Sequence, residues 1–391
     1  MDKIMNTFEK DAAYIAPTYQ RFPLEIVRGS GALLYGSDGK EYIDLGSGIA
    51  VNIFGACDSE WVDAVTRQAS LVQHTSNLFY SEPCARLAEL LCEKTGMSKV
   101  FFGNSGAEAN ECAIKIARKY AAKKKGAEYC NIVTLKGSFH GRTLATLAAT
   151  GQDVFHKDFL PLPEGFLYAE PDDIDDLRRI FEENKVAGVL LEPVQGEGGV
   201  RALSDGYLRS VRLLCDEYDA VMMCDEVQTG NGRTGKLYAY MHAGILPDVV
   251  TTAKGLGGGL PIGCALMSEK MKDVFKAGDH GSTFGGNPIA AAGAVSILSR
   301  IDDALLSDVE RKAAYIRSRL ENAAGVKSVS GRGLMIGIET VRPAGEVIAA
   351  ARENGVLALK AKEKVRLLPP INIDDALLSR AMNTLIAALK P

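Results

Sequence analysis

The sequence lacks the cysteine patterns that mark metal centres and catalytic redox pairs. Its eight cysteines are dispersed over 391 residues, with no Cys-x-x-Cys pair and no cysteine and histidine group at the spacing of a metal site. Free cysteine packs as a small hydrophobic side chain. We therefore expect reduced core thiols and no bound metal.

Strong charge, membrane spans and targeting patterns are also lacking. The formal net charge of -4 gives no field that would attract nucleic acid or an anionic membrane. No apolar run is long enough to span a bilayer, and residues 1–6 lack the basic start and apolar block of a secretory signal. We expect a cytoplasmic protein whose partners are small molecules, with no nucleic-acid or membrane partner.

The middle of the chain consists of short apolar runs, each followed by a polar or glycine-containing turn and a helical pattern. Near-continuous apolar strands that alternate with helices are typical of a mainly parallel sheet covered on both faces. The runs are 100–102, 132–135, 189–191, 221–223, 249–251 and 264–266. They predict an α/β protein whose ligand lies beyond the carboxyl ends of the strands.

The two ends of the chain follow a different pattern. Residues 33–45 favour a hairpin through the turn Asp38-Gly39. The C-terminal part is expected to form, in order, a long helix at 308–322, a strand at 334–338 and an amphipathic helix at 374–389.

These patterns also suggest a division into domains. A chain of 391 residues is long for a single hydrophobic core. We predict a large domain at 51–294 and a smaller α/β domain that combines residues 1–50 with 295–391.

Two residues that follow apolar runs suggest a cofactor. Lys254 lies between the run 249–251 and a glycine cluster, and Asp225 ends the run 221–224. A lysine amine can form an imine with an aldehyde, and a carboxylate beside a pyridine nitrogen keeps that nitrogen protonated. These are the two groups that pyridoxal phosphate most needs from a protein. We predict pyridoxal phosphate as cofactor, with Lys254 and Asp225 as catalytic residues; Asp225 as a simple turn cap is the alternative.

Residues 103–110 follow the first run of the sheet and open a helix. Ser105 and Glu108 have capping-box spacing, which places the start of the helix at Ser105. Free backbone N–H groups and the helix dipole favour a phosphate at such a terminus. The alternative is a capped helix without a ligand.

Residues 137–143 follow the run 132–135. Phe139 could lie against the face of a planar cofactor, and Arg142 offers a bidentate fork for a carboxylate. A core aromatic residue and a surface charge are the alternatives.

Taken together, several ordered motifs resemble the class III, or ω-amino-acid, aminotransferases of pyridoxal-phosphate fold type I, over nearly the whole chain. Such enzymes have a large domain with a mainly parallel sheet and a smaller α/β domain. The motifs are 104–109, 137–143, 192–199, 225–230, 232–235, Lys254 and 282–288.

The resemblance implies roles for residues at matching positions. Lys254 would be the Schiff-base lysine, Asp225 would lie at the pyridinium nitrogen, and Gln228 would lie near the ring hydroxyl. Thr283 would reach the phosphate of the neighbouring subunit's cofactor, which implies a homodimer with shared active sites. The other cofactor-binding residues would be Ser105, Gly106, Ala107, Phe139 and His140.

The resemblance also suggests substrates. Arg142 would hold the substrate α-carboxylate, and Glu197 and Arg366 look like a switchable pair that admits the ω-amino donor and the α-keto acceptor in turn. Residues 360–364 depart from the usual glycine turn before Arg366.

The favoured donor is N2-acetylornithine and the acceptor is 2-oxoglutarate, a pair that belongs to arginine biosynthesis. Ornithine, succinylornithine and 4-aminobutyrate are alternative donors. The residues that support the choice, within 74–80, are Asn77, Phe79 and Tyr80, although ornithine enzymes share the Phe-Tyr element. Ser282 is a further expected substrate-binding residue.

Two other classes of function fit less well. A non-catalytic module that binds pyridoxal phosphate, such as a transcriptional sensor, would need a basic helix-turn-helix segment, which the sequence lacks. A nucleotide-binding oxidoreductase is suggested only by the glycine cluster 255–260, whose sixth position is Leu260 rather than glycine.

Overall fold

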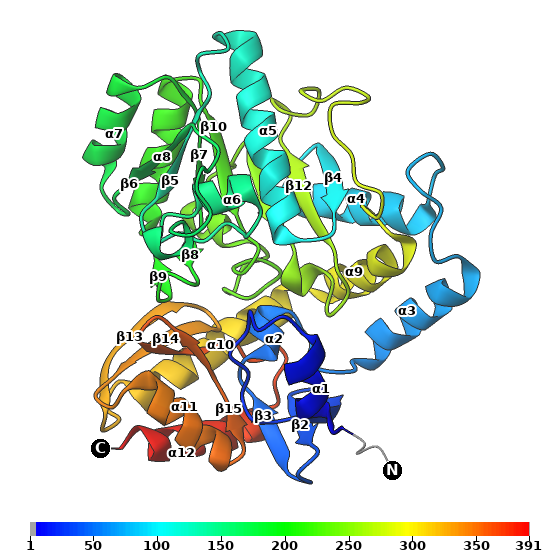
Figure 1. Ribbon diagram of the computed structural model, residues 1–391, viewed down its shortest axis with the longest axis vertical. Coiled ribbons are helices and arrows are strands. Elements are labelled where there is room, and N and C mark those ends of the chain that lie inside the picture. The colour runs from blue at the N-terminus through cyan, green and yellow to red at the C-terminus, as the bar shows by residue number, and fades with distance from the viewer. Residues whose placement is uncertain (1–4, 391) are drawn as a thin grey trace.

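The computed structural model describes residues 5–390 and places the first strands and the last helices of the chain in the same half of the molecule (Figure 1). The other half is built on a seven-stranded sheet in the order β4-β12-β11-β10-β7-β5-β6. Its strands are β4 (Lys99–Gly103), β5 (Asn131–Leu135), β6 (Phe166–Ala169), β7 (Val186–Leu191), β10 (Val221–Asp225), β11 (Val249–Thr252) and β12 (Gly263–Met267).

The predicted mainly parallel sheet is confirmed. All six apolar runs form strands, and only β12 runs antiparallel to its two neighbours, β11 and β4. The seventh strand, β6, was not predicted and lies at the edge beside β5.

Helices cover both faces of this sheet, as β10 shows. Val221 and Met223 point into a cluster with residues of α5 (Gly106–Lys124), whereas Met222 and Cys224 point into a cluster with residues of α8 (Asp205–Glu217). Strands buried on both faces need apolar side chains at every position, which explains the unbroken runs in the sequence.

The half at the bottom of Figure 1 contains two smaller sheets. The predicted hairpin forms β2 (Leu33–Gly36) and β3 (Glu41–Asp44); β1 (Ile26–Ser30) pairs with β2, and β15 (Val356–Leu357) runs parallel to β3. The second sheet has the order β13-β14-β17-β16, with β13 (Val326–Arg332), β14 (Met335–Thr340), β17 (Lys364–Leu367) and β16 (Leu359–Ala361).

The C-terminal elements follow the expected order. The long helix α10 (Asp303–Leu320) begins earlier than predicted because Asp302 caps it by accepting a hydrogen bond from the N–H of Leu305. The strand prediction corresponds to β14, and the final helix is α12 (Asp375–Leu389). The helix α9 (Pro288–Arg300) runs through position 294, so the proposed domain limit falls inside a helix.

The remaining elements complete the chain. The α-helices are α1 (Thr7–Tyr14), α2 (Ser47–Ala50), α3 (Ser59–Leu71), α4 (Glu82–Thr95), α6 (Leu144–Ala149), α7 (Ile174–Glu183) and α11 (Ala344–Glu353). The short 3₁₀ helices are η1 (Asp153–Phe155), η2 (Ala239–Ala243) and η3 (Lys254–Leu256). The strands β8 (Val194–Gln195) and β9 (Arg201–Ala202) pair as a hairpin. Between residues 5 and 390, none of the helices has the length and apolar character needed to traverse a bilayer.

Candidate active site

Two neighbouring parallel strands bring Asp225 and Lys254 to the same edge of the large sheet. Asp225 is the last residue of β10 and lies opposite Thr251 of β11, and Lys254 follows two residues after β11 ends. Lys254 has a φ of +43°, a left-handed conformation that an L-residue adopts at a cost. The chain therefore turns sharply where the lysine leaves the strand.

Asp225 is buried, with 4% of its surface exposed, and is held by side chains from two other segments. Its Oδ2 atom lies 2.7 Å from Nδ2 of Asn110 on α5 and 2.8 Å from Nδ1 of His140, while Oδ1 accepts a hydrogen bond from the N–H of Val227. Thr251 donates to Oδ1 of Asn110 and fixes the amide. This network fixes the orientation of the Asp225 carboxyl group, because each of these neighbours can donate a hydrogen bond to it.

Lys254 is half-buried, and its side-chain amine makes no hydrogen bond or ion pair with any residue between 5 and 390. Burial lowers the pKa of its amine, and the nearby charge of Arg366 lowers it further, while Glu197 and Asp225 act in the opposite direction. An amine with a lowered pKa is more often unprotonated near neutral pH, which suits it for imine formation and proton transfer.

The N-terminus of α5 is a candidate phosphate site. Ser105 caps the helix by accepting a hydrogen bond from the N–H of Glu108, as predicted. The other half of the expected capping box differs: the Glu108 carboxylate binds the N–H of Asn104 and the hydroxyl of Ser105 instead of the N–H of Ser105. The N–H groups of Ser105, Gly106 and Ala107 therefore have no partner among the described residues and can face an anion.

Close packing leaves no room for a side chain behind this terminus. A Cβ at Gly106 would lie 2.7 Å from Cγ1 of Val227, two residues beyond Asp225. The free N–H groups, the carboxylate of Asp225 and the unpaired amine of Lys254 form the donor set that pyridoxal phosphate requires. The residues present therefore fit this cofactor.

A buried glutamate that was not predicted as a site residue joins two loops of the site. Glu192, which follows β7, accepts hydrogen bonds from the N–H of Phe139 at 2.8 Å and from the N–H of Gly196 at 3.0 Å. Burial raises its pKa to about 7. Glu192 thus fixes the loop of Phe139 and the loop of Glu197 to each other.

Glu197 and Arg366 come together as predicted. Nη1 of Arg366 lies 2.5 Å from Oε1 of Glu197 and 3.1 Å from Oε1 of Gln228. Burial alone would raise the pKa of Glu197, but the charge and hydrogen bond of Arg366 bring it below its usual value. Residues 360–364, which depart from the usual glycine turn, contain the turn between β16 and β17. Lys362 in this turn takes a φ of +50°, and the carbonyl of Lys360 faces Arg366.

Gln228, predicted near the cofactor ring hydroxyl, belongs to this same cluster through its contact with Arg366 and a 3.4 Å hydrogen bond to Glu197. Arg142, predicted to bind a carboxylate, follows β5 with its side chain exposed and stacks on Phe139 and Phe155. Five of the predicted side chains, from different segments, therefore surround the strand ends: Lys254, Asp225, His140, Glu197 and Arg366.

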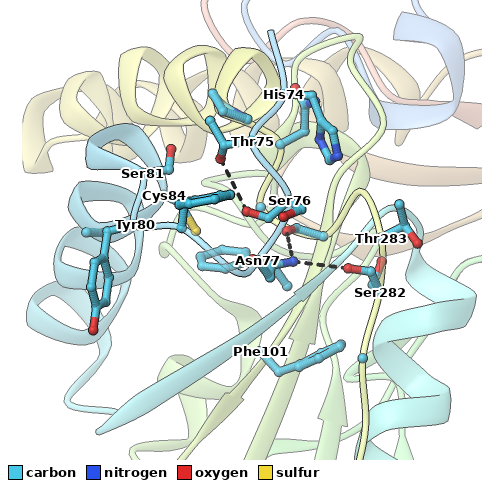
Figure 2. Close-up of a pocket in the computed structure, with 18 of the residues that line it drawn as sticks. His74, Thr75, Ser76, Asn77, Tyr80, Ser81, Cys84, Phe101, Ser282 and Thr283 are labelled. Carbon is cyan, nitrogen blue, oxygen red and sulfur yellow. Dashed lines mark hydrogen bonds between the residues drawn. The ribbon is translucent and has the colours of Figure 1, made fainter. Parts of the chain in front are cut away.

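The structure does not bring the other predicted substrate residues to Lys254. They line a separate cavity of about 730 Å³ on the surface of the chain (Figure 2). Asn77 donates hydrogen bonds to the carbonyls of Ser282 and Gly285, and Tyr80 is fully exposed. The substrate residues concerned are Asn77, Phe79, Tyr80 and Ser282; Thr283, predicted to bind the cofactor of the neighbouring subunit, lines the same cavity.

This cavity is connected to the candidate phosphate site. Nδ2 of Asn104, one residue before Ser105, donates to Oγ of Ser282 at 3.1 Å. Thr283, the next residue after Ser282, is exposed within one chain.

A second buried glutamate lies behind the site and should make the stability of the protein pH-dependent. Glu226 accepts hydrogen bonds from Thr229 and from the N–H of Tyr240, and burial raises its pKa from 4.5 to about 7. The folded state then holds a proton that the unfolded chain releases, so the contribution of Glu226 is fully present below pH 4.5 and is lost as the pH rises towards 7.

Glu226→Gln should remove this contribution to the pH dependence, because the amide mimics the neutral acid. We expect the wild type to lose on the order of 3 kcal/mol more stability than the variant between pH 4.5 and 8. Urea unfolding of both proteins at the two pH values measures the difference. An unchanged pH dependence in the variant would contradict the assignment.

Known proteins are similar to this chain over nearly its whole length, including all the segments that form the site. The family model described as Aminotransferase class-III matches residues 14–389. The acetylornithine aminotransferase of Haemophilus ducreyi is 46% identical over 381 residues, which cover 97% of each chain. That of Caldanaerobacter subterraneus subsp. tengcongensis is 44% identical over 388 residues, covering 97% of this chain and 98% of the relative.

Solved structures agree with this result. The ornithine aminotransferase of Toxoplasma gondii ME49 matches with a TM-score of 0.94 at 32% identity, over 98% of this chain and 94% of that one. The N-acetylornithine aminotransferase of Stenotrophomonas maltophilia K279a matches with a TM-score of 0.83 at 37% identity, over 95% and 96% of the two chains. The similarity therefore includes both halves of the molecule.

Proposed function

This chain belongs to the class III aminotransferases, which depend on pyridoxal phosphate, and on that basis we propose that it transfers the δ-amino group of N2-acetylornithine to 2-oxoglutarate. The products are N-acetylglutamate 5-semialdehyde and glutamate, as in arginine biosynthesis. The observation that carries the chemistry is the unpaired amine of Lys254 beside the oriented carboxylate of Asp225. The choice of donor is supported by relatives that are 41–46% identical over nearly their whole length and are named acetylornithine aminotransferases.

The residues of the site divide the work of binding the cofactor. The N–H groups of Ser105, Gly106 and Ala107 would bind its phosphate, and Phe139 would lie against its ring. Asp225 would keep a proton on the ring nitrogen. When bound, pyridoxal phosphate supplies an aldehyde for the amino group and a ring that accepts the electrons of the adjacent C–H bond.

Lys254 then acts as the base. Its Nζ atom would take the proton from the carbon that carries the amino group and return it at the other end of the reacting system. The lowered pKa of this amine favours the neutral form that can accept a proton. Among the described residues, β10, β11 and the three residues that follow each of them contain no lysine other than Lys254.

Glu197 and Arg366 would let two different substrates use one site. While the donor is bound, Glu197 neutralises Arg366 at 2.5 Å. The α-carboxylate of 2-oxoglutarate can replace Glu197, because a guanidinium binds a carboxylate through a matching pair of N–H donors. Arg142 would hold the α-carboxylate of acetylornithine.

We also propose that two chains form the working enzyme and share their active sites. The cavity in Figure 2 supports this, because Phe79 and Tyr80 line it with exposed aromatic side chains, and Leu78 and Phe284, which adjoin lining residues in the sequence, are exposed as well. A partner chain that covers this face would bring Thr283 and Tyr80 towards the opposite site. A cytoplasmic location is supported by eight cysteines that are all free thiols.

Ornithine is the alternative donor, because the ornithine aminotransferase of Toxoplasma gondii matches with a TM-score of 0.94. Steady-state rates with acetylornithine, ornithine, succinylornithine and 4-aminobutyrate, each against 2-oxoglutarate, separate the candidates. We expect acetylornithine to exceed 4-aminobutyrate and ornithine in kcat/KM by at least about 10-fold, since single contacts contribute discrimination of this size. A preference for unacetylated ornithine would overturn the proposed donor.

A further inference from the structure

Arg142 is held in place by aromatic rings alone. Its guanidinium carbon lies 4.4 Å from the ring centroid of Phe155 and 5.5 Å from that of Phe139. The two rings meet edge to face, with centroids 5.8 Å apart and planes at 74°. Between residues 5 and 390, Arg142 makes no hydrogen bond or ion pair. The N–H donors of the guanidinium are therefore available to a ligand.

Phe155 has a fixed place from which to support Arg142. It ends η1, whose preceding residue Gln152 donates to the Ser138 carbonyl at 3.0 Å and accepts from the N–H of Phe155. Gly151 is tied to the same loop, because its N–H donates to Oγ of Ser138 and its carbonyl accepts from Gly137. The turn that carries Phe155 is thus attached to the loop that carries Phe139 and Arg142.

The geometry suits the recognition of a planar anion. An aromatic face attracts a guanidinium through its flat side, which leaves the N–H groups at the edge free. Without that support, an exposed arginine side chain samples many rotamers and must be ordered whenever a carboxylate binds.

We propose that Phe155 is a positioning residue that holds the guanidinium of Arg142 ready for the α-carboxylate of the donor, and that it thereby sets the preference for donors that carry a carboxylate. This inference rests on the proposed function, in which Arg142 receives that carboxylate. It assigns a role to a residue outside the motifs that characterise the site.

Two donors that differ only in the carboxylate test the proposal. N-acetyl-1,4-diaminobutane is N2-acetylornithine without its carboxyl group, so the ratio of their kcat/KM values reports carboxylate recognition alone. Phe155→Leu keeps an apolar side chain at this half-buried position but removes the aromatic face. We expect this variant to lower the ratio about 3- to 30-fold, mainly through a higher KM for acetylornithine.

Two further variants serve as controls for the stack. Phe155→Tyr keeps the aromatic face and should restore the ratio to near the wild-type value. Phe159→Leu removes a nearby exposed ring that does not contact Arg142, and should leave the ratio unchanged. A Phe155→Leu variant that slows both donors equally would overturn the proposal.

Arg142→Met separates this inference from the assignment on which it rests. If Arg142→Met abolishes the preference for the donor with a carboxylate and Phe155→Leu leaves that preference intact, the role proposed for Phe155 is wrong and the assignment of Arg142 stands. If neither variant changes the ratio, the assignment of Arg142 is wrong and the inference falls with it. We expect both variants to lower the ratio of kcat/KM for acetylornithine to that for N-acetyl-1,4-diaminobutane, and Arg142→Met to lower it more.

Discussion

Replacing Lys254 with alanine is expected to reduce transamination by at least about 10³-fold, the largest effect of any single change in this protein. The amine of Lys254 follows β11, the strand beside the one that ends in Asp225, and it is the group that would form the imine and move the proton, so its loss removes both steps. Initial rates of glutamate formation measure the effect. Turnover near the wild-type rate would refute the assignment of Lys254.

The same variant should still bind pyridoxal phosphate, because the N–H groups at the start of α5 and the carboxylate of Asp225 are unchanged. Cofactor content after desalting checks this. Retained cofactor with lost turnover separates a chemical role of Lys254 from a general loss of folding.

Lys254→Ala can also test whether two chains share each site. Co-expression with Thr283→Val subunits should give mixed dimers in which one site has Lys254 from one chain and Thr283 from the other. We expect the mixture to be more active than the average of the two parent variants. Activity equal to that average would show that Thr283 does not serve the partner's site.

Replacing Asp225 with asparagine is expected to lower kcat by about 10²- to 10³-fold. The amide oxygen can still accept from Asn110 or His140, so the packing of the site is retained, but the negative charge that keeps the ring nitrogen protonated is lost. Steady-state kinetics and the pH dependence of cofactor absorbance measure the change. A kcat within tenfold of the wild-type value would show that the charge is not needed.

Asn110→Ala is a milder change at the same carboxylate. It removes one donor to Asp225 but leaves the carboxylate and its contact with His140. Its effect should therefore be smaller than that of Asp225→Asn and in the same direction.

The large sheet could be predicted from the sequence because strands such as β7 and β10 are buried on both faces and read as unbroken apolar runs. The edge strand β6 was not predicted, because it is not buried on both faces. Three of its four residues are only half-buried, and its short segment mixes aromatic and small residues. An edge strand shares less of the core, so its sequence carries less of the signal.

The candidate site was predictable where one rule applied, namely that ligands lie beyond the carboxyl ends of strands. That rule predicted that Lys254 and Asp225 lie at the same edge of the sheet, where the structure has them. Asn110 lacked such a signal, because its role depends on a contact with Asp225, 115 residues later in the sequence. Glu192 follows β7, but its position in the sequence does not reveal that it accepts a hydrogen bond from the N–H of Phe139, 53 residues earlier. Residues 77–80 carry their own signal, but within one chain they do not reach Lys254; in the proposed dimer they would approach the lysine of the other chain.

The pairing of β3 with β15 has a consequence for the order in which the protein acquires its structure. Ile43 of β3 lies opposite Val356 of β15. The strand β3 is therefore synthesised roughly 300 residues before the strand with which it pairs. During that interval the seven-stranded sheet can assemble from neighbouring segments, while the hairpin of β2 and β3 has one open edge. The nascent chain is therefore most exposed to wrong strand pairing near its beginning, and a ribosome that stalls before residue 356 leaves that edge unprotected.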